Sequence, residues 1–210
     1  MWGQTIVLAD RIKPTLLAWT GGLIIAATAS DQFDPSSAST LPLSILAVFA
    51  QTYIVTAALR VGLDPAAQAA IRPLFGRVFG VSILTTLAIL LGGLLLVIPG
   101  VFLLIRWWVT VPIALDRDVG VTEAMRESWA LTASHWVSIL GLFLVLLAFI
   151  AIPLTGLFFL GGLDEEIVSI PMSLAMNSVL YIGTMIGTVS TVAAYRTIYQ
   201  PVAALREVFE

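Results

Sequence analysis

Five long stretches of this chain contain no charged residue, and this feature limits the possible folds more than any other. They cover residues 14–30, 35–59, 78–105, 137–163 and 167–195. A helix needs roughly 20 mainly apolar residues to cross a bilayer core, and only the first stretch is shorter than that. Only 11% of all residues are charged, against about 25% in an average soluble domain. We therefore expect an all-α, polytopic membrane helix bundle that forms one domain over residues 1–210.

The stretch 78–105 is followed by a short apolar run that ends near Asp116. Pro lacks the N–H that a helix interior needs, and Gly tolerates positive φ, so Pro99-Gly100 is expected to form a tight turn. A further helix would then run from about residue 101 to 116. The 15 residues from Val101 to Leu115 give about 22 Å of helix, less than the ~30 Å hydrocarbon core, so this helix should extend or lie in a thin region. The sequence thus predicts about six transmembrane helices.

The basic residues are distributed unevenly about these six helices. Nine of the ten fall on one side, and the opposite loops contain acidic residues and no basic one. The nine are Arg11, Lys13, Arg60, Arg72, Arg77, Arg117, Arg126, Arg196 and Arg206, and the acidic residues opposite are Asp31, Asp34, Asp164, Glu165 and Glu166. The positive-inside rule then places both termini in the cytoplasm. An alternative for the N-terminus is a signal peptide cleaved after Ala27-Thr28-Ala29.

Two cytoplasmic segments have the pattern of amphipathic helices. Asp64 is a suitable N-cap and Pro65 a suitable first-turn residue, which predicts a helix over residues 66–77, broken at Pro73. The second is expected over residues 122–136 with Thr122 as its N-cap. Residues 1–9 have a weaker pattern of the same kind. Such helices lie in the headgroup plane of a membrane.

The composition also excludes several classes of function. The chain has no Cys and a single His, so disulfides, thiolate catalysis and His-rich metal or haem sites are excluded. A net charge of −3 offers no basic surface for nucleic acid. Neither a catalytic constellation nor a phosphate-binding loop is recognisable, so no cofactor and no enzymatic activity are expected.

Small residues and prolines recur between Gly92 and Leu140. The pattern consists of Pro99, Gly100, Pro112, Gly120, Ala124, Ser128, Leu131 and Thr132. It resembles that of the bacterial YciC-like inner-membrane proteins, and it is equally similar to the membrane domain attached to some glycerophosphoryl diester phosphodiesterases. The resemblance implies a six-helix fold in the bacterial inner membrane, with a Pro-Gly turn in the middle followed by a cytoplasmic helix of small residues. It implies little about activity.

Three small residues of this pattern would share one face of the second amphipathic helix. Gly120, Ala124 and Ser128 are four residues apart, and small residues allow helices to approach closely. We therefore interpret this segment as a helix that docks against the bundle, with Leu131 and Thr132 seating it.

Arg106 lies inside the predicted fourth helix. A cation there costs at least ~2.5 kcal/mol on insertion scales and usually has a partner or faces a cavity. Arg106 could contact an anion or a lipid headgroup, together with Trp107 and Trp108, which favour the interface. It could equally pair with backbone carbonyls or extend its side chain towards the interface. His135, at the predicted start of the fifth helix, is a further headgroup-contact candidate.

Polar side chains also occur within two predicted spans. The second helix contains Gln51, Thr52 and Thr56, and the sixth contains Asn177, Thr184 and Thr188. They could form a polar path for a substrate, or they could be ordinary hydrogen bonds between helices.

These observations favour a non-catalytic membrane protein that organises the envelope or its lipids through partners. Its partners would be membrane lipids and other membrane or envelope proteins. The alternative is a small transporter or lipid-translocating protein that uses the polar faces of the second and sixth helices. An intramembrane enzyme is the least supported class, because the predicted spans contain no acidic residue. A polar cavity between the second and sixth helices would favour the alternative.

Overall fold

A computed structural model describes residues 1–33, 40–95, 97–161 and 169–209, and every regular element in these ranges is an α-helix. The predicted all-α fold is confirmed. In chain order the helices are α1 (Trp2–Arg11), α2 (Lys13–Phe33), α3 (Thr40–Arg60), α4 (Pro65–Ala70), α5 (Phe75–Leu95), α6 (Val97–Arg106), α7 (Thr110–Asp116), α8 (Val121–Thr132), α9 (Trp136–Gly161) and α10 (Ile170–Phe209). Four of the five acidic residues expected opposite the arginines, namely Asp34, Asp164, Glu165 and Glu166, lie outside the described residues.

The described chain contains five stretches that are long and apolar enough to cross a membrane. They are Leu41–Arg60, Phe75–Leu94, Ile98–Asp116, Trp136–Phe159 and Ile170–Tyr199. A sixth candidate is the pair formed by α1 and α2, which are bent by 86° relative to each other. Pro14, in the first turn of α2, cannot donate the backbone hydrogen bond that would continue α1 into α2. The chain is therefore a polytopic membrane protein with five or six spans, which agrees with the expected number.

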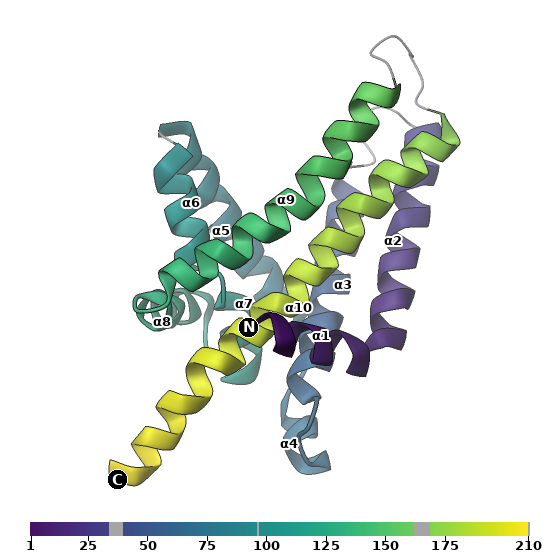
Figure 1. The fold of residues 1–210 in the computed structure, drawn as a ribbon. Coiled ribbons are helices and arrows are strands. Elements are labelled where there is room, and N and C mark those ends of the chain that lie inside the picture. Colours follow the sequence, from purple (N-terminus) through teal and green to yellow (C-terminus); the bar gives the residue numbers. More distant parts are fainter. Residues whose placement is uncertain (34–39, 96, 162–168, 210) are drawn as a thin grey trace.

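The long helix α10 runs through the middle of the molecule and contacts α1, α2, α3, α7 and α9. Figure 1 shows that the α5–α6 hairpin and the group formed by α2, α9 and α10 diverge from a shared base. The largest hydrophobic core lies at this base, where α3, α5, α7 and α10 meet, and it includes Ile54, Ile113 and Val189, none of which is exposed. The core therefore holds the bundle together at one end.

The predicted hairpin exists, but its predicted turn is wrong. Helix α5 ends at Leu95 and α6 begins at Val97, so Pro99 and Gly100 lie within the first turn of α6. Pro is tolerated there because first-turn N–H groups have no acceptor within the helix. Gly100 has a packing role instead, since a Cβ atom added to it would lie 3.0 Å from the Cα and N atoms of Gly93. This glycine allows α5 and α6 to pack closely.

The fourth span consists of two helices, whereas one helix over residues 101–116 was predicted. Helices α6 and α7 are separated at residues 107–109, and together they form the span Ile98–Asp116. The span begins three residues before the predicted helix, because Pro99 and Gly100 belong to α6 instead of forming a turn ahead of it. Pro112 lies in the first turn of α7 and is buried, where its missing N–H is again tolerated.

Both predicted amphipathic helices exist with different bounds. The Asp64 carboxylate accepts a hydrogen bond from the Ala67 N–H at 2.8 Å, as expected of an N-cap, but α4 ends at Ala70 because the chain becomes extended at Ile71, ahead of Pro73. Helix α8 is capped by Gly120 rather than Thr122 and ends at Thr132, and Trp136 already belongs to α9.

Candidate functional site

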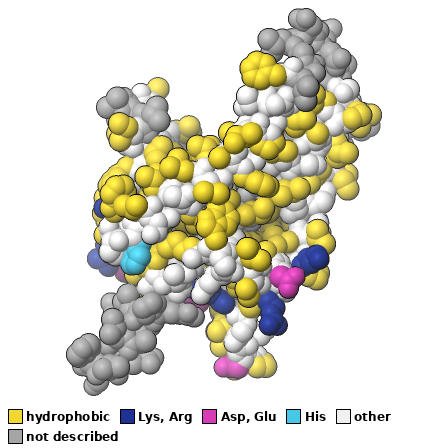
Figure 2. All heavy atoms as spheres, viewed as in Figure 1, with side chains coloured by type: hydrophobic (Ala, Val, Ile, Leu, Met, Phe, Trp, Pro, Cys, Tyr) yellow, Lys and Arg dark blue, Asp and Glu magenta, His cyan; other side chains and the backbone are white. Residues whose placement is uncertain are grey.

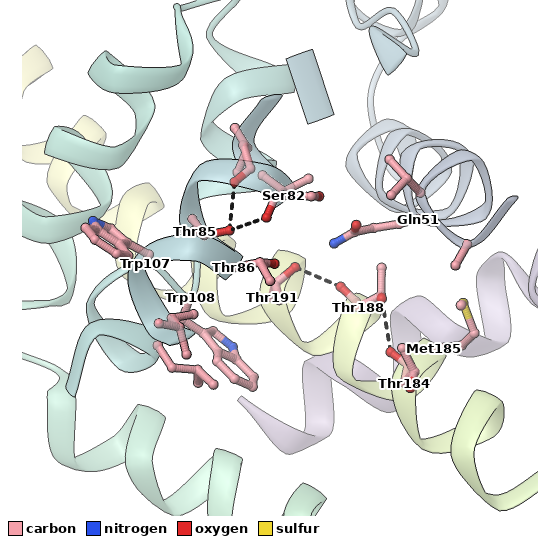
Figure 3. Close-up of a pocket in the computed structure, with 16 residues that line it drawn as sticks. Gln51, Ser82, Thr85, Thr86, Trp107, Trp108, Thr184, Met185, Thr188 and Thr191 are labelled. Carbon is pink, nitrogen blue, oxygen red and sulfur yellow. Dashed lines mark hydrogen bonds between the residues drawn. The ribbon is translucent and has the colours of Figure 1, made fainter. Parts of the chain in front are cut away.

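A cavity of about 380 Å³ lies between α3, α5, α10 and the junction of α6 with α7. Its polar lining comes from three helices, as Figure 3 shows. The polar lining residues are Gln51 from α3, Ser82, Thr85 and Thr86 from α5, and Thr184, Thr188 and Thr191 from α10. None of the lining residues is charged. We call this cavity the lateral groove.

Helix geometry explains why several of these hydroxyls are tolerated inside spans. The Thr85 hydroxyl donates to the Val81 carbonyl at 2.7 Å, and the Thr188 hydroxyl donates to the Thr184 carbonyl at 3.0 Å. Such bonds within a helix satisfy the donor, while the hydroxyl oxygen still offers lone pairs to a ligand. The side chains of Gln51, Ser82 and Thr86, in contrast, have no hydrogen-bond partner among the described residues. The groove therefore offers both donors and acceptors.

Trp107 and Trp108 form another wall of the groove where the fourth span is interrupted. The Trp108 ring packs edge-on against Phe143 of α9, with centroids 6.1 Å apart. Its indole Nε1 is buried and has no hydrogen-bond partner in the described part of the chain. Because this atom is fully covered, a molecule in the groove would meet the Trp108 ring and not its N–H.

The depth of the groove follows from helix rise. Gln51 precedes Arg60 by nine residues of α3, or about 13 Å of helix. Thr184 and Thr191 precede Arg196 by twelve and five residues of α10, or about 18 and 8 Å. Since the hydrocarbon core is about 30 Å thick, the groove begins near the arginines and reaches the middle of the spans.

The groove opens sideways. Thr86 and Thr184 are exposed and lie on its rim, on α5 and α10. Both residues lie well inside candidate spans, where the surrounding medium is lipid. A molecule could therefore enter the groove directly from the bilayer.

Arginines hold the helix ends together just beyond the groove. Arg196 donates to the carbonyls of Ala58, Leu59 and Val61 at 3.1, 2.8 and 2.8 Å. Arg77 donates to the Ala114 carbonyl at 3.1 Å. These carbonyls lie at the C-terminal ends of α3 and α7, where unpaired acceptors and the negative end of the helix dipole favour a cation. The arginines thus fix α3, α5, α7 and α10 at the base of the groove.

Arg106 does not line the groove, although the two following tryptophans do. Its guanidinium carbon lies 5.0 Å from the Phe102 ring centroid and 5.1 Å from that of Trp129, and Nη1 donates to the Trp129 carbonyl at 3.4 Å. Its Nε is buried and has no partner within the described ranges. The side chain is thus directed to α8, and a role in headgroup contact stays a prediction. His135 lies in the α8–α9 turn, its Nδ1 2.9 Å from the Ser134 hydroxyl.

Helix α8 packs against the bundle through the small residues of the sequence pattern, with one exception. Ala124, Ser128 and Thr132 are completely buried, and Leu131 packs partly against the core. Gly120 is exposed, and a Cβ atom there would meet nothing within 4 Å. It does not belong to the packed strip because it precedes the helix as its N-cap.

Two of the docking residues also donate hydrogen bonds to the interrupted fourth span. The hydroxyls of Ser128 and Thr132 donate to the Arg106 carbonyl at 2.9 and 3.1 Å. Arg106 is the last residue of α6, and carbonyls at a helix end have no partner within the helix. Helix α8 therefore supplies the hydrogen bonds that this end requires.

The polar-path candidates divide into three groups. Gln51, Thr184 and Thr188 line the groove, as stated above. Thr52 and Thr56 are buried and bond to the carbonyls of Val48 and Thr52 in their own helix at 2.7 Å each. Asn177 lies far from the groove along α10 and donates to the Asp31 carboxylate of α2 at 2.8 Å.

Sequence reasoning missed the α5 side of the groove. Ser82, Thr85 and Thr86 follow the i, i+3, i+4 spacing of one helix face, and this spacing was the available signal. On α10, Thr191 continues the row of Thr184 and Thr188 that the sequence already indicated. Comparisons with family models, curated proteins and solved structures found no match to this chain.

Proposed function

We propose that this protein is a small lipid-handling transporter that takes the polar part of a membrane amphiphile into the lateral groove. The single observation that carries this proposal is an uncharged cavity in the middle of apolar spans, with polar groups from three helices set in a mainly apolar lining. A protein that served only as a scaffold would need no such cavity. The groove therefore favours the transporter class over a non-catalytic organiser that acts through partners.

The interrupted fourth span supports the same proposal. Broken helices at membrane depth are tolerated where they line a cavity or are buried in protein, and they are frequent at the binding sites of transporters. Here the interruption contributes Trp107 and Trp108 to the groove, and α8 satisfies the Arg106 carbonyl. The site thus combines a polar cavity with a place where the chain could bend.

We also propose that the protein lies in a bacterial inner membrane with both termini in the cytoplasm. Figure 2 shows Lys and Arg side chains at one end of the molecule, beyond the large hydrophobic surface. The positive-inside rule assigns that end to the cytoplasm, and the resemblance to YciC-like proteins supports this location. Reporter fusions after Gly100 should read outside and fusions after Arg126 inside. A Gly100 fusion that reads inside would contradict the topology.

Transport can be tested with the purified full-length chain in liposomes that contain fluorescent lipids. The wild type should speed the movement of labelled lipid between leaflets, as measured by quenching of the outer leaflet. Thr184→Phe should return the rate to that of empty liposomes, because a ring on the exposed rim would fill the opening. Ile182→Phe is a matched control, since Ile182 is 42% exposed on the same helix and does not line the groove.

Two results would contradict the proposal. Equal rates for Thr184→Phe and Ile182→Phe would show that the groove is not the path. A wild type that moves no lipid, yet retains a stoichiometric protein partner when purified in native lipid, would restore the scaffold interpretation.

A further inference from the structure

We infer that the groove selects a lipid whose head is uncharged and bears hydroxyl or ester groups, such as diacylglycerol, and that it rejects phospholipids. This assignment rests on the proposed function and specifies its substrate class. It follows from the chemistry of the lining, the positions of the nearby cations and the depth of the groove.

The free hydrogen-bonding groups in the groove are all neutral. Gln51 offers an amide with two donors and an acceptor, and Figure 3 shows it directed across the groove towards the α5 and α10 residues. Ser82 and Thr86 offer hydroxyls. A hydroxyl can donate and accept, and an ester carbonyl can accept. A glycerol ester with one free hydroxyl therefore matches this set.

The neighbouring cations are engaged elsewhere. Arg106 lies between Phe102 and Trp129 on the side of α8. Arg196 donates to three carbonyls at and just beyond the end of α3, as described above, and Arg77 is paired with Asp118. A phosphate in the groove would consequently have no counterion, and an unpaired buried charge is strongly disfavoured. No group in the lining would offset the free-energy cost of moving a phospholipid's phosphate out of the hydrated headgroup layer.

The depth and the opening favour a lipid over a free polyol. The groove lies about 8 to 18 Å of helix from Arg196, which is below the level at which phosphates are hydrated. Glycerol has the same hydroxyl chemistry as a neutral lipid head, but it would have to reach the groove through the bilayer. The exposed rim at Thr86 and Thr184 instead admits a molecule already dissolved in lipid.

The test uses the purified full-length chain in nanodiscs and a diacylglycerol with a photoreactive diazirine on one acyl chain. Peptide mapping after illumination should place the label on α5 and α10. Unlabelled diacylglycerol should remove it, whereas phosphatidic acid with the same acyl chains and free glycerol should not. Gln51→Leu and Thr86→Val should each reduce saturable labelling several-fold. Ser178→Ala removes an exposed α10 hydroxyl outside the groove and should label as the wild type does.

The possible failures are distinguishable. Competition by phosphatidic acid equal to that by diacylglycerol would overturn the neutral-head assignment and leave the proposed function intact. Displacement by glycerol would overturn the lipid assignment in favour of a free polyol. Unchanged labelling in both Gln51→Leu and Thr86→Val would show that the head does not bind these groups. If neither diacylglycerol nor a photoreactive phospholipid labels the groove saturably, both the inference and the proposed function fail.

Discussion

The arginine end of the bundle and the tip of the α5–α6 hairpin are held by different interactions. At the arginine end, side chains cross between helices, and Tyr195 of α10 adds a hydrogen bond of 2.6 Å to Asp116 at the end of α7. The tip of the α5–α6 hairpin makes no comparable polar contact among the described residues, and Leu94 and Ile98 are 84% and 79% exposed. The helices of the hairpin instead meet through the backbones of Gly93 and Gly100.

This difference follows from the solvent at each end. Helix ends have unpaired carbonyls, and an arginine satisfies several of them at once where α3, α7 and α10 converge. Within the hydrocarbon, leucine gains nothing by leaving lipid, so helices associate by close packing of small residues. The groove lies between the region held by arginine hydrogen bonds and the region held by close packing of small residues. Its base is therefore fixed, and its side towards the lipid is open. Each prediction below disturbs one side of this comparison.

The largest loss of stability is expected on substitution of Arg196. Arg196→Met keeps much of the side-chain volume and removes the bonds to three carbonyls at and just beyond the end of α3. Since a hydrogen bond to a charged group contributes about 1.5–3 kcal/mol, the free energy of unfolding should fall by about 3 kcal/mol. Unfolding in mixed detergent and SDS micelles measures it. Arg72→Met is the control, because Arg72 is exposed and its side chain bonds to no described residue. Equal losses in both variants would contradict the capping role.

A smaller loss of stability is expected from a substitution where α8 docks against the bundle. Ser128→Leu forces a larger side chain into a completely buried position and removes one bond to the Arg106 carbonyl. Overpacking typically costs about 1–3 kcal/mol, so we expect a loss of about 2 kcal/mol in the same assay. The one hydroxyl proton of Thr132 is shared between the Arg106 carbonyl and the nearer Ser128 carbonyl. Glu127→Ala removes only the partly exposed ion pair with Arg117, worth about 0–1 kcal/mol. If the glutamate variant lost more stability than the serine variant, the docking interpretation would be wrong.

The smallest change in stability is expected in the α5–α6 hairpin, and the sign of this change should differ between substitutions at two glycines. A Cβ at Gly100 would lie 3.0 Å from backbone atoms of Gly93, whereas a Cβ at Gly93 would meet nothing within 4 Å. Gly100→Ala should therefore destabilise by about 1 kcal/mol, because backbone rather than a flexible side chain must move. Gly93→Ala should be neutral or stabilising by up to about 1 kcal/mol, from helix propensity. Thermal unfolding in detergent compares them, and identical shifts would argue against close packing here.

Most of the fold was predictable because hydropathy and charge report directly on the solvent of each segment. The spans and the buried face of α8 follow from such local signals. The turn was misplaced because Pro and Gly have two uses, and Pro99 and Gly100 serve in the first turn and the packing of α6 rather than in a turn. Sequence alone does not separate these uses, since the deciding contact is with Gly93 on another helix.

The candidate site was predictable only in part. Gln51, Thr184 and Thr188 were identified because they are polar inside apolar runs. Whether such residues share a cavity depends on which helices are neighbours and how they are rotated. Asn177 consequently meets Asp31 of α2 instead, while Ser82 and Thr86 of α5 complete the groove. Neighbouring helices are fixed by packing over the whole bundle, which no local pattern records.

The bond between α8 and the Arg106 carbonyl has a consequence for biogenesis. The acceptor lies in the fourth span, but its donors, Ser128 and Thr132, follow it by 22 and 26 residues. During synthesis the fourth span therefore leaves the ribosome before the groups that complete it. The hydrogen bonds at the end of α6 can form only after α8 has been synthesised.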